Sequence, residues 1–211
     1  MTLRRRNTSG DCQSEAVYST CLRYRYTLTR TWDGDGPRLL WVMLNPSTAT
    51  ERLNDPTIER CERRTRALGY GAMRIVNLFA WRATRPADLR AAADPEGPAN
   101  ARALTAGARW ADAALCAWGT HGARGGAGAA AIGRLAATGT PLLTLGLTKD
   151  GHPRHPLYVA YAEAPRPWHP DQKRAFQTAS DPLYARIRAA TQAAGPPRAL
   201  LDDIPACAMT L

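Results

Sequence analysis

The sequence predicts an α/β protein: a three-layer sandwich around a central, mostly parallel four-stranded sheet, with an added N-terminal strand and a C-terminal helical tail. Three observations predict this fold. The chain has 211 residues, of which 45% are apolar and 22% charged, enough to bury a core. Short continuous apolar runs, typical of strands buried on both faces, alternate with segments of helical pattern. Such alternation favours parallel pairing of the strands with helices packed on the sheet.

The first half of the chain supplies a strand, a buried strand and a helix. Residues 1–15 are polar and are expected to form a disordered arm. Tyrosines and leucines predict a strand over 17–31, and the apolar run 39–44 predicts the first buried strand. Asp55-Pro56 is typical of a helix start, because Asp caps the first turn and Pro fits the first helical position. The helix is expected to end at Gly69 or Gly71.

The second half repeats this alternation and ends in a tail. Residues 16–168 are therefore expected to form a single α/β domain, and 169–211 a helical or partly disordered tail with a helix from Asp181. Further strands are expected over 73–76, 113–118, 141–147 and 157–162, and further helices over 99–110 and through the Ala-rich stretch to Ala137.

The charge is strongly positive and comes from arginine. The sequence has 28 Lys+Arg against 18 Asp+Glu, a net charge of +10, and only Lys149 and Lys173 are lysines, so 26 of the 28 are arginines. This charge favours a polyanionic partner, nucleic acid foremost. A GC-rich genome produces the same composition without any function, so both interpretations stay open.

Cysteine spacing and hydropathy exclude several classes of protein. The five cysteines form no C-x-x-C pair, which argues against a disulfide framework, a zinc ribbon and an iron–sulfur cluster. No apolar run approaches ~18 residues, so no membrane span is expected. The basic N-terminus lacks the apolar stretch of a secretory signal. We expect a cytoplasmic monomer that binds no cofactor and no membrane.

Polar motifs follow the four predicted buried strands at the point where each strand ends. In an open parallel sheet, ligands bind at the carboxyl ends of the strands. The motifs are therefore expected to line one pocket at that edge. They are Asn45-Pro46-Ser47-Thr48, Asn77-Leu78-Phe79, Trp118-Gly119-Thr120-His121 and the Gly/His/Pro-rich run 151–158. His121, His152 and His155 have no acidic or Cys partner at metal-ligand spacing, so no metal is expected.

Five sequence blocks resemble a known family. Between Tyr24 and Trp168 the chain contains, in order, LNPSTA, DPTIERC, NLFAWRAT, AWGTHG and TKDGHPRHPLY. By these blocks it is identified as a member of the bacterial family catalogued as domain of unknown function 1643, a label without an assigned activity. The same order resembles, more distantly, the uracil-DNA glycosylase superfamily. That resemblance implies its fold and hydrolysis of the N-glycosidic bond of a damaged or modified base, in DNA repair or DNA modification.

The resemblance to the glycosylases also implies roles for individual residues. Asn45 stands where those enzymes place a water-activating residue, although the acidic type is absent here. His152 or His155 matches the catalytic histidine, and both remain candidates because the closing loop is one residue longer. Leu157 matches the side chain that wedges into the base stack. Base or ligand binding is implied for Ser47, Thr48, Asn77, Phe79, Trp118 and Gly119. Arginines in or beside the motif loops are expected to contact nucleic acid: Arg52, Arg82, Arg85, Arg124 and Arg154.

Other interpretations of the same residues remain. The alternatives to a glycosylase are a non-catalytic nucleic-acid or nucleotide-binding module and an enzyme acting on a small nucleoside-like molecule. Asn45 and Asn77 also suit the capping of turns, and Trp118 suits the core. The arginines of the predicted helix, Arg60, Arg63, Arg64 and Arg66, are predicted to form a solvated face rather than a DNA contact.

Overall fold

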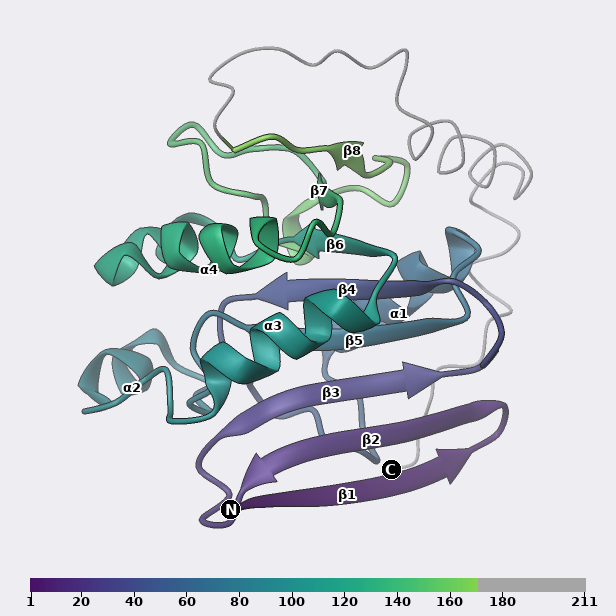
Figure 1. Cartoon of the computed structure of the whole chain (residues 1–211), viewed down its shortest axis with the longest axis horizontal. Coiled ribbons are helices and arrows are strands. Elements are labelled where there is room, and N and C mark those ends of the chain that lie inside the picture. Colours follow the sequence, from purple (N-terminus) through teal and green to yellow (C-terminus); the bar gives the residue numbers. More distant parts are fainter. Residues whose placement is uncertain (171–211) are drawn as a thin grey trace.

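The structure is a computed structural model that describes residues 1–170. The helix expected from Asp181 and the rest of the predicted tail beyond residue 170 lie outside the described residues. Eight strands form one sheet in the order β1-β2-β3-β5-β4-β6-β7-β8 (Figure 1). They are β1 (Thr2–Ser9), β2 (Cys12–Ser19), β3 (Arg25–Thr31), β4 (Arg38–Met43), β5 (Ala72–Asn77), β6 (Ala113–Cys116), β7 (Leu142–Thr144) and β8 (Arg166–Pro167).

Helices cover both faces of this sheet. α1 packs on one face, and α3 and α4 lie on the other (Figure 1). The helices are α1 (Pro56–Ala67), α2 (Pro86–Ala91), α3 (Asn100–Trp110) and α4 (Ala127–Ala136), with two 3₁₀ helices, η1 (Thr120–Gly126) and η2 (Pro156–Tyr158). Among the described residues, no helix combines the length and the apolar character that crossing a bilayer requires.

The prediction of a central, mostly parallel four-stranded sheet is wrong. The sheet has eight strands and is mixed, and four of its seven pairings are antiparallel: β1–β2, β2–β3, β3–β5 and β7–β8. The strand expected over 17–31 is two strands, the end of β2 and all of β3, and they are joined by a turn at 20–24. Alternating polar and apolar side chains on these antiparallel strands produce no continuous apolar run, so the pattern used to count buried strands misses them.

Residues 1–15, expected as a disordered arm, form β1 and the start of β2. β1 is an edge strand with exposed residues from Thr2 to Arg6. Its side chains gain partners only through pairing, because Arg4 and Arg6 both donate to Glu15 on β2. The order of this segment therefore depends on a hairpin contact rather than on local hydrophobicity.

The segment expected as a strand over 157–162 is also different. It contains the short helix η2 and a turn. Pro156 stands at the first helical position, and several backbone carbonyls of this segment accept hydrogen bonds from arginines of α1 rather than from a neighbouring strand. Arginine side chains thus donate the hydrogen bonds that a neighbouring strand would otherwise supply to these carbonyls.

Three parallel pairings in the middle of the sheet determine where a ligand can bind. β4 pairs in parallel with β5 on one side and β6 on the other, and β6 pairs in parallel with β7. The carboxyl ends of these strands therefore meet at one edge, and the loops that leave them lie together. The apolar run Leu39–Met43 is completely or almost completely buried, which matches the coverage of both faces.

Candidate functional site

Two adjoining clefts lie at the carboxyl edge of the parallel strands. The first has a volume of about 260 Å³, and we call it the arginine cleft; its lining residues include Asn45, Phe79, Arg85, Arg90 and Arg124. The second has a volume of about 430 Å³, and we call it the histidine cleft; its lining residues include Trp118, Gly119, Arg154, His155 and Tyr158. Both clefts are lined by Leu44, Thr120 and His121.

The walls of the clefts are basic. Four arginines line them, Arg85, Arg90, Arg124 and Arg154, and among the described residues no aspartate or glutamate does. Arg85 pairs with Asp88 at 2.9 Å on the exposed rim. The walls of the clefts thus offer an anionic ligand positive charge, and the Asp88 carboxylate beside them is paired with Arg85.

Asn45 is oriented by two hydrogen bonds. Its Nδ2 donates to Pro46 O at 2.9 Å and to Ala83 O at 2.8 Å. Since a carbonyl oxygen only accepts, these bonds determine which end of the amide is nitrogen. Oδ1 is then the end of the side chain left to accept a hydrogen bond in the cleft.

Buried arginines of β3 position the loop that carries Asn45. Arg25 donates to Ala49 O, and Arg30 donates to Thr50 O at 2.7 Å and to Asn54 Oδ1 at 2.9 Å. The pairing of β2 with β3 shifts register between Val17 and Tyr18, and Tyr26 is the unpaired residue of that bulge. A bulge re-aims the following side chains, and here it turns Arg25 toward the same loop as Arg30.

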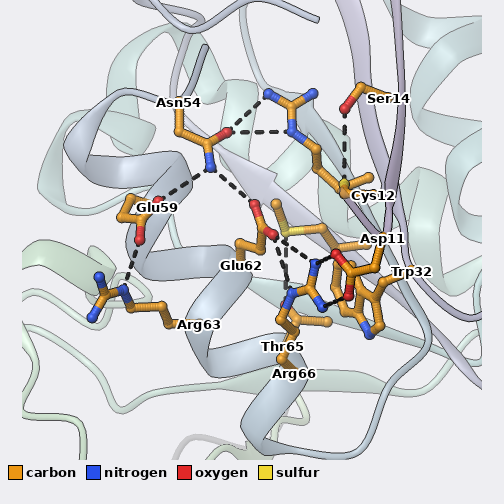
Figure 2. Close-up of polar contacts among 12 residues, drawn as sticks. Asp11, Cys12, Ser14, Trp32, Asn54, Glu59, Glu62, Arg63, Thr65 and Arg66 are labelled. Carbon is orange, nitrogen blue, oxygen red and sulfur yellow. Dashed lines mark hydrogen bonds and ion pairs between the residues drawn. The ribbon is translucent and has the colours of Figure 1, made fainter. Parts of the chain in front are cut away.

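Asn54 continues this polar contact onto α1. Its Nδ2 donates to Glu59 and Glu62, and Glu62 in turn pairs with Arg66, which also binds Asp11 (Figure 2). Asn54 therefore connects the loop that follows β4 both to Arg30 of the sheet and to α1.

His155 lies in the histidine cleft with a defined ring orientation. It caps η2, and its Nδ1 accepts a long hydrogen bond, 3.4 Å, from Leu157 N–H. Nδ1 therefore carries no proton in the neutral ring, and the proton lies on Nε2. Burial lowers the pKa of His155, an effect that the nearby Asp55 carboxylate partly offsets. The ring is thus a neutral donor at physiological pH.

Trp118 and Gly119 line the histidine cleft where it meets the core. Trp118 is 2% exposed and meets Trp168 edge-to-face at 5.7 Å between ring centroids, so its ring belongs mainly to the core. Gly119 has φ 72°, a conformation that favours glycine, and its N–H donates to Pro153 O at 2.8 Å. This bond brings the loop after β6 against the loop that carries His155.

The structure brings together eight of the predicted site residues and leaves the others outside the two clefts. Asn77 ends β5 and continues the alternation of Met73 and Ile75 toward the α1 face; it is 1% exposed, and both polar atoms of its side chain lack a partner. Those that line a cleft are Asn45, Phe79, Arg85, Arg124, Trp118, Gly119, Arg154 and His155. Those that do not are Ser47, Thr48, Arg52, Asn77, Arg82, His152 and Leu157.

Other predicted site residues that line neither cleft have contacts elsewhere or lie at the surface. His152 closes a turn, since its backbone N–H donates to Thr148 Oγ1 and its O accepts from Thr148 N–H. Arg82 lies over the Tyr18 ring at 5.6 Å and donates to Leu22 O. Arg52 lines a separate surface depression with Arg5 and Arg6. Leu157 remains exposed at 39%.

His121 lines the clefts, although the sequence analysis gave it no individual role in the site. It lines both clefts, and so does Thr120. The signal was available, because both residues stand in the motif after the third buried strand. Tyr158 likewise ends the run 151–158 expected at the pocket, whereas Arg90 stands in none of the motifs, since its place depends on how α2 packs. Within residues 1–170, no group of three or more His, Cys, Asp or Glu is placed to hold a metal ion.

Comparison with known proteins yields one match. A family model described as "Protein of unknown function (DUF1643)" matches residues 25–157. The matched range runs from the first residue of β3 to Leu157 in η2, so it includes Asn45, His155 and the arginines that bind their loops. No curated protein and no solved structure matches the chain.

Proposed function

Because the chain belongs to the DUF1643 family of proteins of unknown function, we propose its activity from the site itself. The proposed activity is hydrolysis of the N-glycosidic bond of a damaged or modified base in DNA. One observation carries it: an oriented amide, Asn45, and a half-buried neutral imidazole, His155, line adjoining clefts that share Leu44, Thr120 and His121.

The chemistry of base release requires two such groups. Cleavage leaves an oxocarbenium-like sugar and a base that carries negative charge. Asn45 Oδ1 accepts a hydrogen bond from the attacking water and orients it. His155 donates from Nε2 to the departing base and stabilises its charge, where one such donor is worth ~10²-fold in rate. Between the two candidate histidines the proposal takes His155, because His152 does not line either cleft.

The arginine cleft supports a phosphate-bearing substrate. Arg90 and Arg124 are exposed and face the same cleft as Asn45, and Arg124 Nη2 donates to Arg90 O at 3.1 Å. The phosphates of a DNA strand fit such donors. The order of the motifs around Asn45 and His155, which resembles that of the uracil-DNA glycosylase superfamily, also favours this reaction. Asn77 has no part in it, because it is 1% exposed and lines neither cleft.

One observation favours a second candidate, a non-catalytic module that binds nucleic acid or a nucleotide. Among the described residues, both clefts lack a carboxylate, and the group proposed to orient the water is an amide, which is a weaker base. A histidine cleft of about 430 Å³ is also large enough for a free nucleoside-like molecule. Substrate size and turnover distinguish these alternatives.

The test compares base release and binding for the same variants. Purified protein is incubated with oligonucleotides that carry different modified bases, and released base and affinity are measured. Asn45→Ala and His155→Ala are expected to lower turnover by ~10²-fold and leave affinity nearly unchanged, because both groups act mainly in the transition state. His152→Ala is the matched control and is expected to retain activity.

Two outcomes would overturn the proposal. DNA binding without base release from any oligonucleotide supports the binding module. Binding of free nucleosides without binding of DNA supports the small-molecule enzyme.

A further inference from the structure

Two arginines of α1 bind the segment that follows His155. Arg60 donates from Nε to Pro156 O at 2.8 Å and from Nη2 to Val159 O at 2.7 Å. Arg64 donates from Nη2 to Val159 O at 2.9 Å and to Ala160 O at 2.6 Å. Its Nη1 donates to the carbonyls of Tyr161, at 3.4 Å, and Glu163, at 3.0 Å. Two side chains thus satisfy five carbonyls of 156–163.

The same two guanidinium groups stack on one aromatic ring. The Arg60 and Arg64 guanidinium carbons lie 4.2 and 5.1 Å from the centroid of the Tyr161 ring. Arg64 is only 4% exposed, and burial lowers its pKa. A buried guanidinium needs partners for its donors. Displacing 156–163 would leave this charge without them, so the segment has one strongly preferred position on α1.

The neighbouring arginines of α1 form ion pairs with carboxylates. Arg63 pairs with Glu59 at 2.6 Å, and Arg66 pairs with Glu62 and Asp11 (Figure 2). Their partners are carboxylates of the helix itself and of the β1–β2 turn. The side chains that bind the backbone carbonyls of 156–163 are therefore those of Arg60 and Arg64, which stand four residues apart on the same face of α1.

We propose that Arg60 and Arg64 are positioning residues for His155, which fix η2 against α1 so that Leu157 N–H meets Nδ1 and the Nε2–H donor is presented in the histidine cleft. The connection is short, because Pro156, whose carbonyl Arg60 binds, is the residue next to His155. The effect on catalysis rests on the proposed function. The effect on the imidazole itself does not.

The surroundings of His155 determine the sign of the expected change. The Asp55 carboxylate at the start of α1 attracts its charged form, Arg154 and His121 line the same cleft, and the Tyr158 ring lies 5.8 Å away. Burial is the largest cause of the lowered pKa, and Asp55 opposes it. A loosened segment hydrates the ring, so the pKa rises toward its ordinary value; the smaller loss of attraction to Asp55 opposes that rise.

The test measures the histidine directly. Nitrogen-15 NMR of the imidazoles in the full chain, with His155→Gln used for assignment, gives both the tautomer and the pKa of His155. Arg64→Gln and Arg60→Gln are each expected to raise that pKa and to mix the two neutral tautomers. Arg60→Lys retains the charge without the two-pronged donor and is expected to restore the wild-type signal only in part. Arg63→Gln, on the same helix, is the matched control and is expected to change neither quantity.

The outcomes separate this inference from the proposed activity. If Arg64→Gln does not fold, Arg60→Gln, at a more exposed position, decides the question. An unchanged tautomer and pKa in a folded Arg60→Gln variant overturns the inference. If the wild type releases base, Arg60→Gln is expected to lower kcat by about 10²-fold without changing KM. NMR changes as expected in a protein that releases no base would leave the inference standing and overturn the activity.

Discussion

The arginines that bind loops differ from the arginines of the clefts in what their guanidinium groups meet. Arg25, Arg30 and Arg64 are at most 4% exposed and donate to backbone carbonyls of the loops that carry Asn45 and His155. Arg90 and Arg124 are exposed on the wall of a cleft. Buried arginines therefore position the loops of the site, and exposed arginines give the cleft its positive charge.

Because some arginines are buried, the net charge overstates how much positive charge lies at the surface. A value of +10 suggests a uniformly basic surface, but part of that charge is enclosed by carbonyl groups and aromatic rings. Buried guanidinium groups contribute little to the attraction of a polyanion. Only the exposed arginines are expected to determine how binding depends on salt, and stability is expected to depend mainly on the others.

The largest expected effect is loss of stability on replacing a loop-binding arginine. Arg30→Met is expected to lower the free energy of unfolding by about 3 kcal/mol, because Thr50 O and Asn54 Oδ1 lose their donor in a buried place. Arg124→Met, in the arginine cleft, is expected to stay within about 0.5 kcal/mol of wild type. Urea unfolding of both variants measures the difference, and equal losses would contradict the comparison.

Asn45 both binds loop carbonyls and lines a cleft, as the two groups of arginines do separately. Its replacement by an acid therefore tests both roles in one side chain. Asn45→Asp places a carboxylate oxygen against Pro46 O and Ala83 O, where Nδ2 now donates. The expected loss of stability is about 2 kcal/mol, and base release is not expected to improve despite the stronger water-activating group. A stable Asn45→Asp variant with faster base release would show that the amide is not oriented by these two carbonyls.

A smaller effect is expected from the cleft arginines, and it appears in binding. Each phosphate contact removed by Arg90→Gln or Arg124→Gln is expected to reduce the slope of log K against log salt by about 0.9. Thermal stability is expected to remain close to that of wild type. Titrations of a DNA oligonucleotide at several salt concentrations measure the slope. Arg60→Gln serves as the control, and a slope that falls equally in that variant would remove the distinction between the two groups.

The smallest effect concerns pH. The folded-state pKa of His155 is lowered, while the unfolded value is about 6.5, so the unfolded state binds more protons between these two values. Stability therefore rises with pH through that window and is lost below it. The wild type is expected to lose more stability than His155→Gln between pH 7 and pH 5. Parallel denaturation curves at the two pH values would contradict this.

The sequence by itself determined the features that depend on neighbouring residues. Asp55-Pro56 predicts the start of α1, and the structure confirms it, since Asp55 Oδ1 accepts from Thr57 N–H and Ile58 N–H. The run 39–44 becomes β4 within a residue at each end. Asn45 after β4 and residues 118–121 after β6 line the clefts, because parallel strands place their carboxyl ends at one edge.

Only the tertiary structure decided which strands join the sheet and which arginines are buried. β1 is polar and becomes ordered by pairing with β2, a contact that no local pattern predicts. Arg60 and Arg64 have the sequence pattern of a solvated helix face, yet they bind carbonyls 95 or more residues away along the chain. An arginine is buried where a distant loop leaves carbonyl groups without donors, and that condition depends on the packing of the whole chain rather than on the residues beside it.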